Sequence, residues 1–372
     1  MPTVAEIRAQ ALEVAAGWSP PDAPASWRLT AGLFTAIAAH EELLTQLTGL
    51  PADRLPALLA SAAITMTVGR HNPAPLARYF PEPGQPQPPF DPGFSPAAVA
   101  FVSAHLEEIT AVCREHRYQM NEVARCSQIA LGIAAVADPA AGPIALLDLG
   151  TGAGLGLHLD RYRYRMGGQA YGSENAALTL DCEVRGPGQP PPVTLPPIAE
   201  RAGIELNPVE LGDPAARAWL RACAPPEASA LSRLIAAIEV ALCHPATIVA
   251  GDAVTALPAV LDSLPARLPV VVTDAYMAVF LAPEQRLELA AVLAAAARVR
   301  PVTWLSLDPL VPLGPQGRHS VQGLPVPAAL ADDYRRTGVF AVLGARTFGP
   351  GGGQDRLLAR AHPSGRWVQW LG

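Results

Sequence analysis

Lysine is absent from this sequence of 372 residues, so all 27 basic residues are arginines. The absence excludes a catalytic lysine, a lysine Schiff base and the lysine of a phosphate-binding P-loop. Charge of either sign is also scarce, because only 16% of the residues are charged and the formal net charge is −6. The arginines are dispersed, so we expect no basic face for nucleic acid.

Several other signals are missing. The five cysteines form no C-x-x-C pair, and His71, His116 and His319 have no metal-like spacing to any partner, so neither a disulfide framework nor a metal site is predicted. No G-x-S-x-G motif supports a hydrolase. The first residues carry acids where a signal peptide is basic and apolar. No uncharged apolar run reaches the ~18 residues of a membrane span. We therefore expect a cytoplasmic protein with no membrane partner.

The first part of the chain has helical periodicity. Ile7, Ala11, Val14 and Trp18 form one apolar stripe, and similar stripes follow. Residues 80–96 contain seven prolines, which excludes a helix or a central strand. The sequence thus predicts an N-terminal helical cap over residues 1–95, ending in a proline-rich linker, and a second domain over residues 96–372. The second domain should begin with two helices that are separated near Arg117.

After Gly142, short apolar runs alternate with helical stretches. Strands are expected at IALLDLG, LTLDCEVRG, ATIVAGDA, LPVVVTDAY and PVTWLSLDP, with helices at ASALSRLIAAIEVAL and EQRLELAAVLAAAARV. This alternation favours a parallel sheet covered on both faces. Near the C-terminus, VFAVLGARTFG and DRLLARAHPSGRWVQWLG flank Pro-Gly-Gly-Gly and predict an antiparallel strand pair.

The first of these strands runs into a glycine-rich turn that begins at Asp148. Glycine permits positive φ and lets a ligand approach the backbone, and the N–H groups of a following helix attract polar groups. The dinucleotide pattern G-x-G-x-x-G fails, because leucine stands where its third glycine should fall. The pattern present is D-x-G-x-G-x-G, with glycines at positions 150, 152 and 154.

This turn resembles the first motif of class I S-adenosylmethionine (SAM)-dependent methyltransferases. The resemblance implies a Rossmann-like α/β fold, with a seven-stranded, mostly parallel sheet and an antiparallel C-terminal strand pair. It also implies a SAM site at Asp148, Gly150, Gly152, Gly154, Glu183 and Asp252. Glu183 would end the second strand and bind the ribose diol, since a carboxylate accepts two hydrogen bonds. Asp252 would contact the adenine amine, although a helix N-cap is a competing role.

The segments NEVARC, LGTGAGLGLHLDRYRYRMGG, CEVRG and VTDAYMAVFLAPEQR resemble an actinobacterial family of unknown function with a methyltransferase-like core behind a helical N-terminal region. The resemblance spans roughly residues 30 to 310. Members more often have Glu-Leu-Gly-Ala-Ser-Ala-Gly at the turn, so this chain is closer to the general methyltransferase motif.

Polar residues on either side of the first strand are candidates for substrate binding: Asn121, Glu122, Arg125, Asp160, Arg161, Tyr162 and Tyr164. Arginines could grip a carboxylate or phosphate, and tyrosines could stack or donate a hydrogen bond. The alternative is an internal network of ion pairs and hydrogen bonds. On helices, Asn121 would share a face with Arg125, and Asp160 with Tyr164.

Two functional classes remain open. The first is a SAM-dependent methyltransferase acting on a small molecule, with Asp274 and Tyr276 as candidates for the catalytic proton acceptor. The second is a non-catalytic protein of the same fold that binds a nucleotide-like metabolite or a protein partner. The glycine spacing disfavours a third class, the nicotinamide-dependent oxidoreductases.

Overall fold

The computed structural model describes residues 1–72, 74–312, 319–337, 340–349 and 353–372. The chain divides into two compact units. The first unit comprises Met1–Asn121 and Glu210–Ile235, and the second comprises Glu122–Val209 and Ala236–Gly372. This division differs from the boundary expected after residue 95, because the helices that follow the proline-rich segment belong to the first unit.

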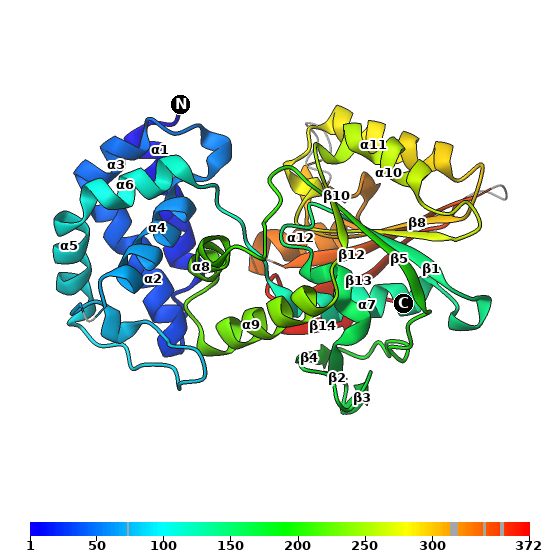
Figure 1. Ribbon diagram of the computed structural model, residues 1–372, viewed down its shortest axis with the longest axis horizontal. Helices are drawn as coiled ribbons and strands as arrows, with labels where there is room; N and C mark the ends of the chain where they lie inside the picture. Colours follow the sequence, from blue (N-terminus) through cyan, green and yellow to red (C-terminus); the bar gives the residue numbers. More distant parts are fainter. Residues whose placement is uncertain (73, 313–318, 338–339, 350–352) are drawn as a thin grey trace. The chain divides into compact units, whose positions relative to one another are not determined.

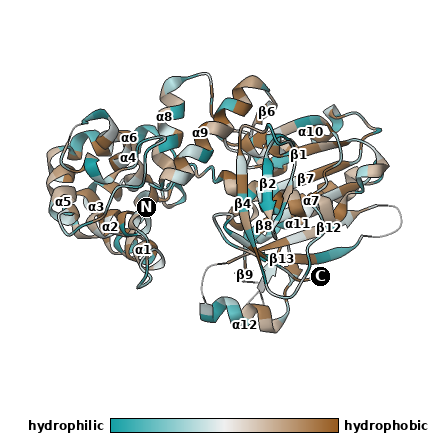
Figure 2. Cartoon of the chain, turned by 90° about the horizontal axis from the view of Figure 1, so that it is seen from below, coloured by the Kyte–Doolittle hydropathy of each residue, from teal (hydrophilic) through white to brown (hydrophobic). Residues whose placement is uncertain are grey.

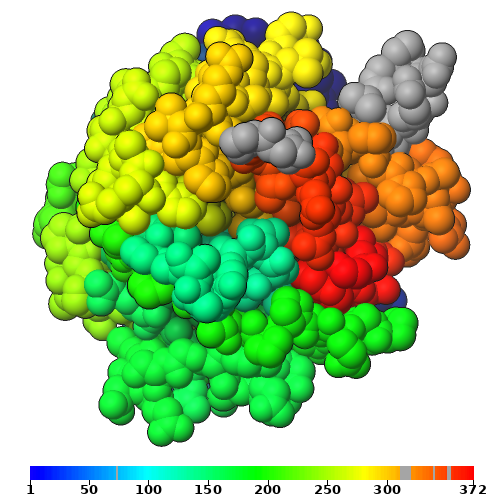
Figure 3. Space-filling view, turned by 90° about the vertical axis from the view of Figure 1, so that its right-hand side faces the viewer, coloured from blue at the N-terminus to red at the C-terminus, as the bar shows by residue number. Residues whose placement is uncertain are grey.

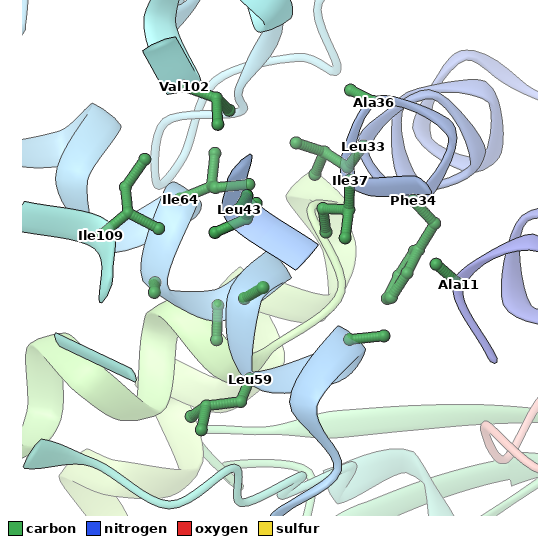
Figure 4. Packing of buried hydrophobic residues seen from close by; sticks show 14 of the residues in the cluster. Ala11, Leu33, Phe34, Ala36, Ile37, Leu43, Leu59, Ile64, Val102 and Ile109 are labelled. Atoms are coloured by element: carbon green, nitrogen blue, oxygen red, sulfur yellow. The ribbon is translucent and has the colours of Figure 1, made fainter. Parts of the chain in front are cut away.

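Helices build the first unit (Figure 1): α1 (Val4–Gly17), α2 (Ala25–Ala39), α3 (Glu41–Leu47), α4 (Pro56–Arg70), α5 (Phe94–Ala104), α6 (Leu106–Glu115) and α8 (Pro214–Cys223). Their buried apolar residues form one cluster, part of which is drawn in Figure 4, including Leu33, Ile37, Leu43, Leu59 and Ile64. Brown and teal residues share these helices in Figure 2, as amphipathic helices require.

The start of helix α1 is specified by its sequence. Thr3 is the N-cap, and its hydroxyl oxygen accepts the N–H of Glu6 at 3.2 Å while the Glu6 carboxylate accepts the N–H of Thr3 at 2.7 Å. This reciprocal capping box satisfies two donors that the helix leaves unpaired. Ile7 and Ala11 are buried, as the predicted stripe requires.

The proline-rich segment forms no helix before Phe94, as expected. The rings of Tyr79 and Phe90 pack around Phe94, with centroids 5.2 and 5.0 Å from its ring. The carboxylate of Asp91 accepts the Tyr79 hydroxyl and the N–H of Gly93, both at 2.7 Å. Aromatic packing and one carboxylate therefore hold this segment in place of regular hydrogen bonding.

The helix expected after Arg117 begins later than predicted. Residues 116–122 are not helical, Val123–Arg125 form a 3-10 turn, and α7 is Cys126–Val136. Tertiary contacts override the local pattern here. The Arg54 guanidinium donates to backbone carbonyls at the end of α6, and the indole N–H of Trp219 donates to the carbonyl of Arg117 at 2.8 Å.

The second unit is built on one large sheet of mixed direction. The sheet has eleven strands and not the seven expected. In order across the sheet they are β3 (Gln169–Tyr171), β2 (Arg163–Met166), β4 (Thr179–Arg185), β14 (Trp367–Trp370), β13 (Asp355–Ala361), β12 (Ala341–Phe348), β8 (Val302–Pro309), β7 (Val270–Ala275), β1 (Ile144–Leu149), β5 (Ile198–Glu205) and β6 (Thr247–Ala250). A small second sheet contains β9 (Val311–Pro312), β10 (His319–Val321) and β11 (Leu324–Pro325).

Five neighbouring strands, β6-β5-β1-β7-β8, run parallel. Helices α10 (Ala253–Ser263) and α11 (Pro283–Ala296) cover the face that carries Trp304 (Figure 1). Gly132 of α7 lies against the neighbouring side chain, Leu305, which points to the opposite face. The sheet is thus covered on both faces, as the apolar strands predicted.

The strand predictions were largely confirmed, with one consequential omission. The runs predicted as strands correspond to β1, β4, β6, β7 and β8, and β12 and β13 form the expected antiparallel pair. Most of the Pro-Gly-Gly-Gly turn between them lies outside the described residues. The prediction missed β5, which is the strand that pairs with β1. It also placed β4 in the parallel core, whereas β4 pairs with β2 and β14.

The C-terminal strand explains why the sheet grows beyond seven strands. β14 pairs in parallel with β4, so that Trp367 lies opposite Glu183. Figure 3 shows this C-terminal segment in red beside the green segment that follows β4. The strands β2, β3 and β4, which the sequence places directly after the glycine turn, are thereby added to the far edge of the sheet.

Two further helices complete the fold. α9 (Ala228–Cys243) begins in the first unit and ends in the second, and α12 (Ala328–Thr337) is largely hydrophilic (Figure 2). Among the described residues, no single helix has both the length and the apolar character of a membrane span; α5 and α6, bent by 75°, meet those criteria only as a pair.

Candidate functional site

The winding of the parallel strands reverses between β1 and β7. After β1, the next parallel core strands in chain order are β5 and β6 on one side of it, followed by β7 and β8 on the other, while β2, β3 and β4 lie at the far edge of the sheet. In open α/β sheets, ligands bind outside the carboxyl ends of the strands at such a reversal. Asp148, Glu205 and Asp274 stand at or next to the carboxyl ends of β1, β5 and β7. Three carboxyl groups therefore mark the place where a ligand is expected.

The glycine turn follows β1 directly. Gly150, Gly152 and Gly154 have φ of +65°, +59° and +73°, a region that disfavours side chains. A Cβ on Gly150 would lie 2.6 Å from Cγ of Met277, and one on Gly154 would lie 2.8 Å from Cδ1 of Ile248. The alternating glycines are thus required by the backbone path and by close packing.

The segment after the turn is not the α-helix expected. Leu155–Arg161 form a 3-10 helix, which is interrupted at His158. Tyr164 and Arg165 lie on strand β2, so Asp160 and Tyr164 do not share a helical face. The N–H groups of a regular helix therefore do not contribute to ligand binding at this turn.

Asp148 faces the interior of the turn. Its Oδ1 accepts the hydroxyl of Thr273 at 2.7 Å, and Thr273 is its register partner on β7. Burial raises the pKa of the Asp148 carboxyl to about 6, against the hydrogen bond from Thr273. The nearby carboxyls of Asp274 and Glu205 contribute smaller parts of this increase in pKa.

Glu205 is the acid that ends the strand beside β1. Its Oε2 accepts the N–H of Gly152 at 2.8 Å, and its Oε1 accepts the N–H of Asn207 at 3.0 Å. A carboxylate has about four acceptor positions, so about two stay available for a ligand. The carboxylate thus holds the glycine turn and still has capacity for a diol.

Glu183 does not reach this site, and its expected role must be corrected. Five strands separate β4 from β1, which at ~4.8 Å per strand places Glu183 on the order of 30 Å away. Its side chain is 59% exposed, and its Oε2 accepts from the Arg185 guanidinium at 2.7 Å. The resemblance implies an acid at the end of the second strand for the ribose; in the parallel core, β5 is the strand that follows β1 in chain order, and it ends at Glu205.

Asp252 follows β6 and caps α10. Its Oδ1 accepts the N–H groups of Val254 and Thr255, both at 3.0 Å. The N-cap alternative is therefore confirmed, while Oδ2 stays available for the adenine contact that the resemblance implies.

Asp274 is fully buried, and protein groups occupy both of its oxygens. The indole N–H of Trp304 donates to Oδ2 at 2.7 Å, and the hydroxyl of Ser306 lies 3.1 Å from Oδ1. Asp308 is also buried and interacts with Asp274, and its Oδ2 lies 2.9 Å from the hydroxyl of Ser306. Burial raises the pKa of both carboxyls, and the pKa of Asp308 is further raised by the charge of Asp274. Because the charge of Asp274 adds to the effect of burial, the protonated form is favoured more strongly at Asp308 than an isolated carboxyl would allow.

Tyr276 adopts φ of +64°, which is strained for an aromatic residue. The guanidinium of Arg125 lies 4.1 Å from the centroid of its ring. The Tyr276 hydroxyl is buried and has no hydrogen-bond partner among the residues that the structure describes. Its buried position raises the pKa of this phenol, against the effect of Arg125. The structure therefore brings Tyr276, a candidate catalytic residue, into contact with Arg125, a candidate substrate-binding residue.

The residues Asp160–Arg165 form a network of internal contacts. Asp160 receives two hydrogen bonds from Arg201, at 2.6 and 2.8 Å. A guanidinium nitrogen of Arg161 lies 3.4 Å from the ring Nε2 of His244. The buried hydroxyl of Tyr162 donates to the carbonyl of Leu155 at 2.7 Å, and that of Tyr164 donates to the carbonyl of Leu159. These contacts support the network alternative.

Asp160, Tyr162 and Tyr164 nevertheless border a hollow of about 430 Å³, whose other wall is the proline-rich stretch 193–197. The tyrosine hydroxyls are committed to backbone carbonyls, so Asp160 is the member of the cluster that is still partly exposed at this hollow.

Asn121 and Glu122 were expected on one helix with Arg125, but neither residue is helical in the structure. Asn121 lies in irregular structure, where its amide nitrogen is 3.5 Å from the carbonyl of Gln119. The Glu122 carboxylate caps the 3-10 turn by accepting the N–H of Ala124 at 3.1 Å. Arg125 is buried, and its Nε donates to the carbonyl of Pro363 at 2.6 Å.

Sequence reasoning missed Glu205 and Asp308. Glu205 could have been found as the acid that closes IAERAGIE, but the charged residues of that run disguise a strand. Asp308 follows Ser306 at a spacing of two in LSLDP, which places both side chains on one face of β8.

No curated protein matches the chain. The family model described as "Uncharacterized protein conserved in bacteria (DUF2332)" matches residues 6–370, which is nearly the whole chain. This match agrees with the expected resemblance to a family of unknown function, and the chain therefore belongs to the DUF2332 family.

Proposed function

We propose that this protein is a SAM-dependent methyltransferase acting on a small molecule. The observation that carries the proposal is the position of Glu205 beside the glycine turn, at the switch point of the parallel strands. The resemblance to class I methyltransferases assigns the ribose diol to the acid at the end of the second strand, and in the parallel core the strand that follows β1 in chain order is β5. Glu205 stands there and has unused acceptor capacity.

The residues around the turn fit the cofactor. Gly152 is part of the turn and carries no side chain, so the backbone can be approached there. Asp148 would lie near the methionine end, Glu205 would bind the ribose and Asp252 would contact the adenine. When bound, SAM would supply an electrophilic methyl group for transfer to the acceptor.

The catalytic roles expected at the end of β7 divide between two residues. Asp274 is enclosed by Trp304, Ser306 and Asp308, so its role is to fix the end of β7. The Tyr276 hydroxyl has unused hydrogen-bonding capacity and is the group we assign to orienting the acceptor. Catalysis would rest mainly on proximity and alignment.

One observation favours the second candidate function, a non-catalytic protein of this fold. Met277 packs against Gly150, with its Cγ 2.6 Å from where a Cβ of Gly150 would lie. This side chain covers part of the turn. Methionine is flexible, so it can also move aside for a ligand.

Titration calorimetry with S-adenosylhomocysteine tests the proposal. We expect the wild-type chain to bind it and Glu205→Gln to bind at least tenfold more weakly, because an amide offers fewer acceptors to the diol. Glu183→Gln is the matched control and should bind like the wild type. The proposal fails if the wild-type chain gives neither heat nor a thermal shift at millimolar ligand, or if Glu205→Gln is indistinguishable from the control.

Substitution of Met277 distinguishes the methyltransferase from the non-catalytic protein. If Met277→Ala binds S-adenosylhomocysteine more tightly than the wild type, the side chain obstructs the turn, as the non-catalytic candidate requires. If Met277→Ala binds equally or less well, the side chain is part of a working site.

A further inference from the structure

Three potential metal ligands meet in the first unit, away from the glycine turn in the sequence. His71 directly follows α4, His105 joins α5 to α6, and Glu108 lies in the first turn of α6. Each offers one ligand atom, and the three atoms lie within 4.8 Å of one another. His105 and Glu108 are three residues apart, a spacing that places both on one face of a helical turn.

The distances suit a small divalent cation. Nε2 of His71 lies 2.7 Å from Oε2 of Glu108, and Nδ1 of His105 lies 4.0 Å from the same oxygen. In a tetrahedral zinc site, with bonds of 2.0–2.2 Å, donor atoms are separated by about 3.4 Å. Side-chain movements of about 0.7 Å or less would bring these two distances to that value.

Neighbouring groups hold the three ligands in place. The rings of His71 and His105 have centroids 4.2 Å apart, and Phe101 packs on His105 at 4.4 Å. Arg70 lies 3.2 Å from Oε1 of Glu108, which leaves Oε2 directed at the two imidazoles. The Arg70 charge opposes a cation, but its side chain is 46% exposed, so solvent and salt screen this repulsion.

The three side chains are accessible to solvent and are of types that bind zinc. The side chains of His71, His105 and Glu108 are 41%, 26% and 32% exposed, so an ion can enter from solvent. Two imidazoles and one carboxylate are ligands that Zn²⁺ accepts, and three protein ligands leave the fourth position for water or a substrate atom. We propose that His71, His105 and Glu108 form a binding site for Zn²⁺ or a similar first-row divalent ion.

Competition with a chromophoric chelator measures zinc binding directly. The experiment uses the full, tag-free chain with Cys243→Ser, which removes the one exposed thiol among the described residues. We expect one zinc ion per chain, and at least tenfold weaker binding in His105→Ala and in Glu108→Gln. Glu107→Gln is the matched control, since Glu107 is an exposed acid in the same helical turn. Zinc affinity should fall at acid pH because imidazole must be neutral to bind a metal.

A second metal and a folding control distinguish specific binding at this site from other outcomes. Cobalt(II) provides a second readout, because its absorption reports whether the ion is four-coordinate. The proposal is overturned if the parent chain does not compete for zinc, or if His105→Ala and Glu108→Gln bind it as tightly as Glu107→Gln. Circular dichroism of the metal-free variants shows that they fold, and His71→Gln replaces any variant that does not.

Discussion

The guanidinium carbon of Arg125 lies 4.1 Å from the centroid of the Tyr276 ring. A cation–π contact of this kind is worth up to ~2 kcal/mol when it is shielded from water, and Arg125 is buried. A strained backbone conformation, such as that of Tyr276, costs on the order of 1–3 kcal/mol. The contact therefore helps to hold the ring in place directly after β7.

The Tyr162 hydroxyl has a hydrogen-bond partner, whereas the Tyr276 hydroxyl has none among the described residues. Two tyrosine substitutions test this difference. Tyr162→Phe removes a buried hydrogen bond to the carbonyl of Leu155, so it should lower the free energy of unfolding by about 1–2 kcal/mol. Tyr276→Phe removes a buried hydroxyl without a described partner, so stability should be unchanged or rise by up to ~1 kcal/mol. Urea unfolding of both variants provides the measurement. A loss at Tyr276→Phe equal to that at Tyr162→Phe would contradict the assignment.

The raised pKa of Asp308 beside Asp274 predicts unequal effects of two conservative substitutions. Asp308→Asn imitates the protonated partner and should be tolerated, because its amide can donate to Asp274. Asp274→Asn places an NH₂ group against the indole N–H of Trp304 or against the donors at Oδ1, whichever way the amide turns. We expect it to cost about 1–3 kcal/mol. Chemical unfolding at pH 7 compares the two, and equal losses would rule out the proton assignment.

Local patterns were enough to predict the glycine turn, the strand before it and several strands later in the chain. The apolar runs of β1, β7 and β8 need no knowledge of their neighbours, and the alternating glycines correspond to three positive φ angles. The acid of the site was misassigned because strand adjacency is not local. β5 contains Glu200 and Arg201, and Arg201 is accommodated only because Asp160, 41 residues earlier, pairs with it.

The number of strands in the sheet could not be predicted either, because it also depends on which strands lie side by side. β4 was correctly predicted as a strand, but its partner β14 comes from the last residues of the chain. Likewise, residues 116–122 have a helical pattern, and distant donors such as Trp219 bind their carbonyls instead. Pairings of this kind depend on the folded chain as a whole.

The turn itself should be intolerant of side chains. Gly150→Ala combines a positive φ with a contact 2.6 Å from Cγ of Met277, so we expect a loss of about 1–3 kcal/mol. Gly17→Ala is the matched control, because a Cβ there meets no atom within 4 Å and the residue ends helix α1. It should be neutral or slightly stabilising. Thermal unfolding compares the two, and equal midpoints would show that the turn adapts.

Asp148 gives the protein a defined dependence of stability on pH. Its pKa is raised from 3.8 to about 6, so between these values the folded protein keeps a proton that the unfolded chain has released. The free energy of unfolding contributed by this group is therefore fully present below about pH 4 and is lost as the pH rises through 6. Asp148→Asn cannot lose a proton, so its stability relative to the wild type should increase by roughly 1–3 kcal/mol from pH 4 to pH 7.

Urea unfolding across this pH range, with the exposed Asp262→Asn as control, measures the effect of Asp148. Any constant effect of the new amide cancels, because only the change with pH is compared. A stability difference between Asp148→Asn and the wild type that stays flat from pH 4 to pH 7 would show that the carboxyl is hydrated and not buried against Thr273. A slope confined to this window, and absent from the control, would locate the titration at the end of β1, where the ligand of the glycine turn is expected to bind.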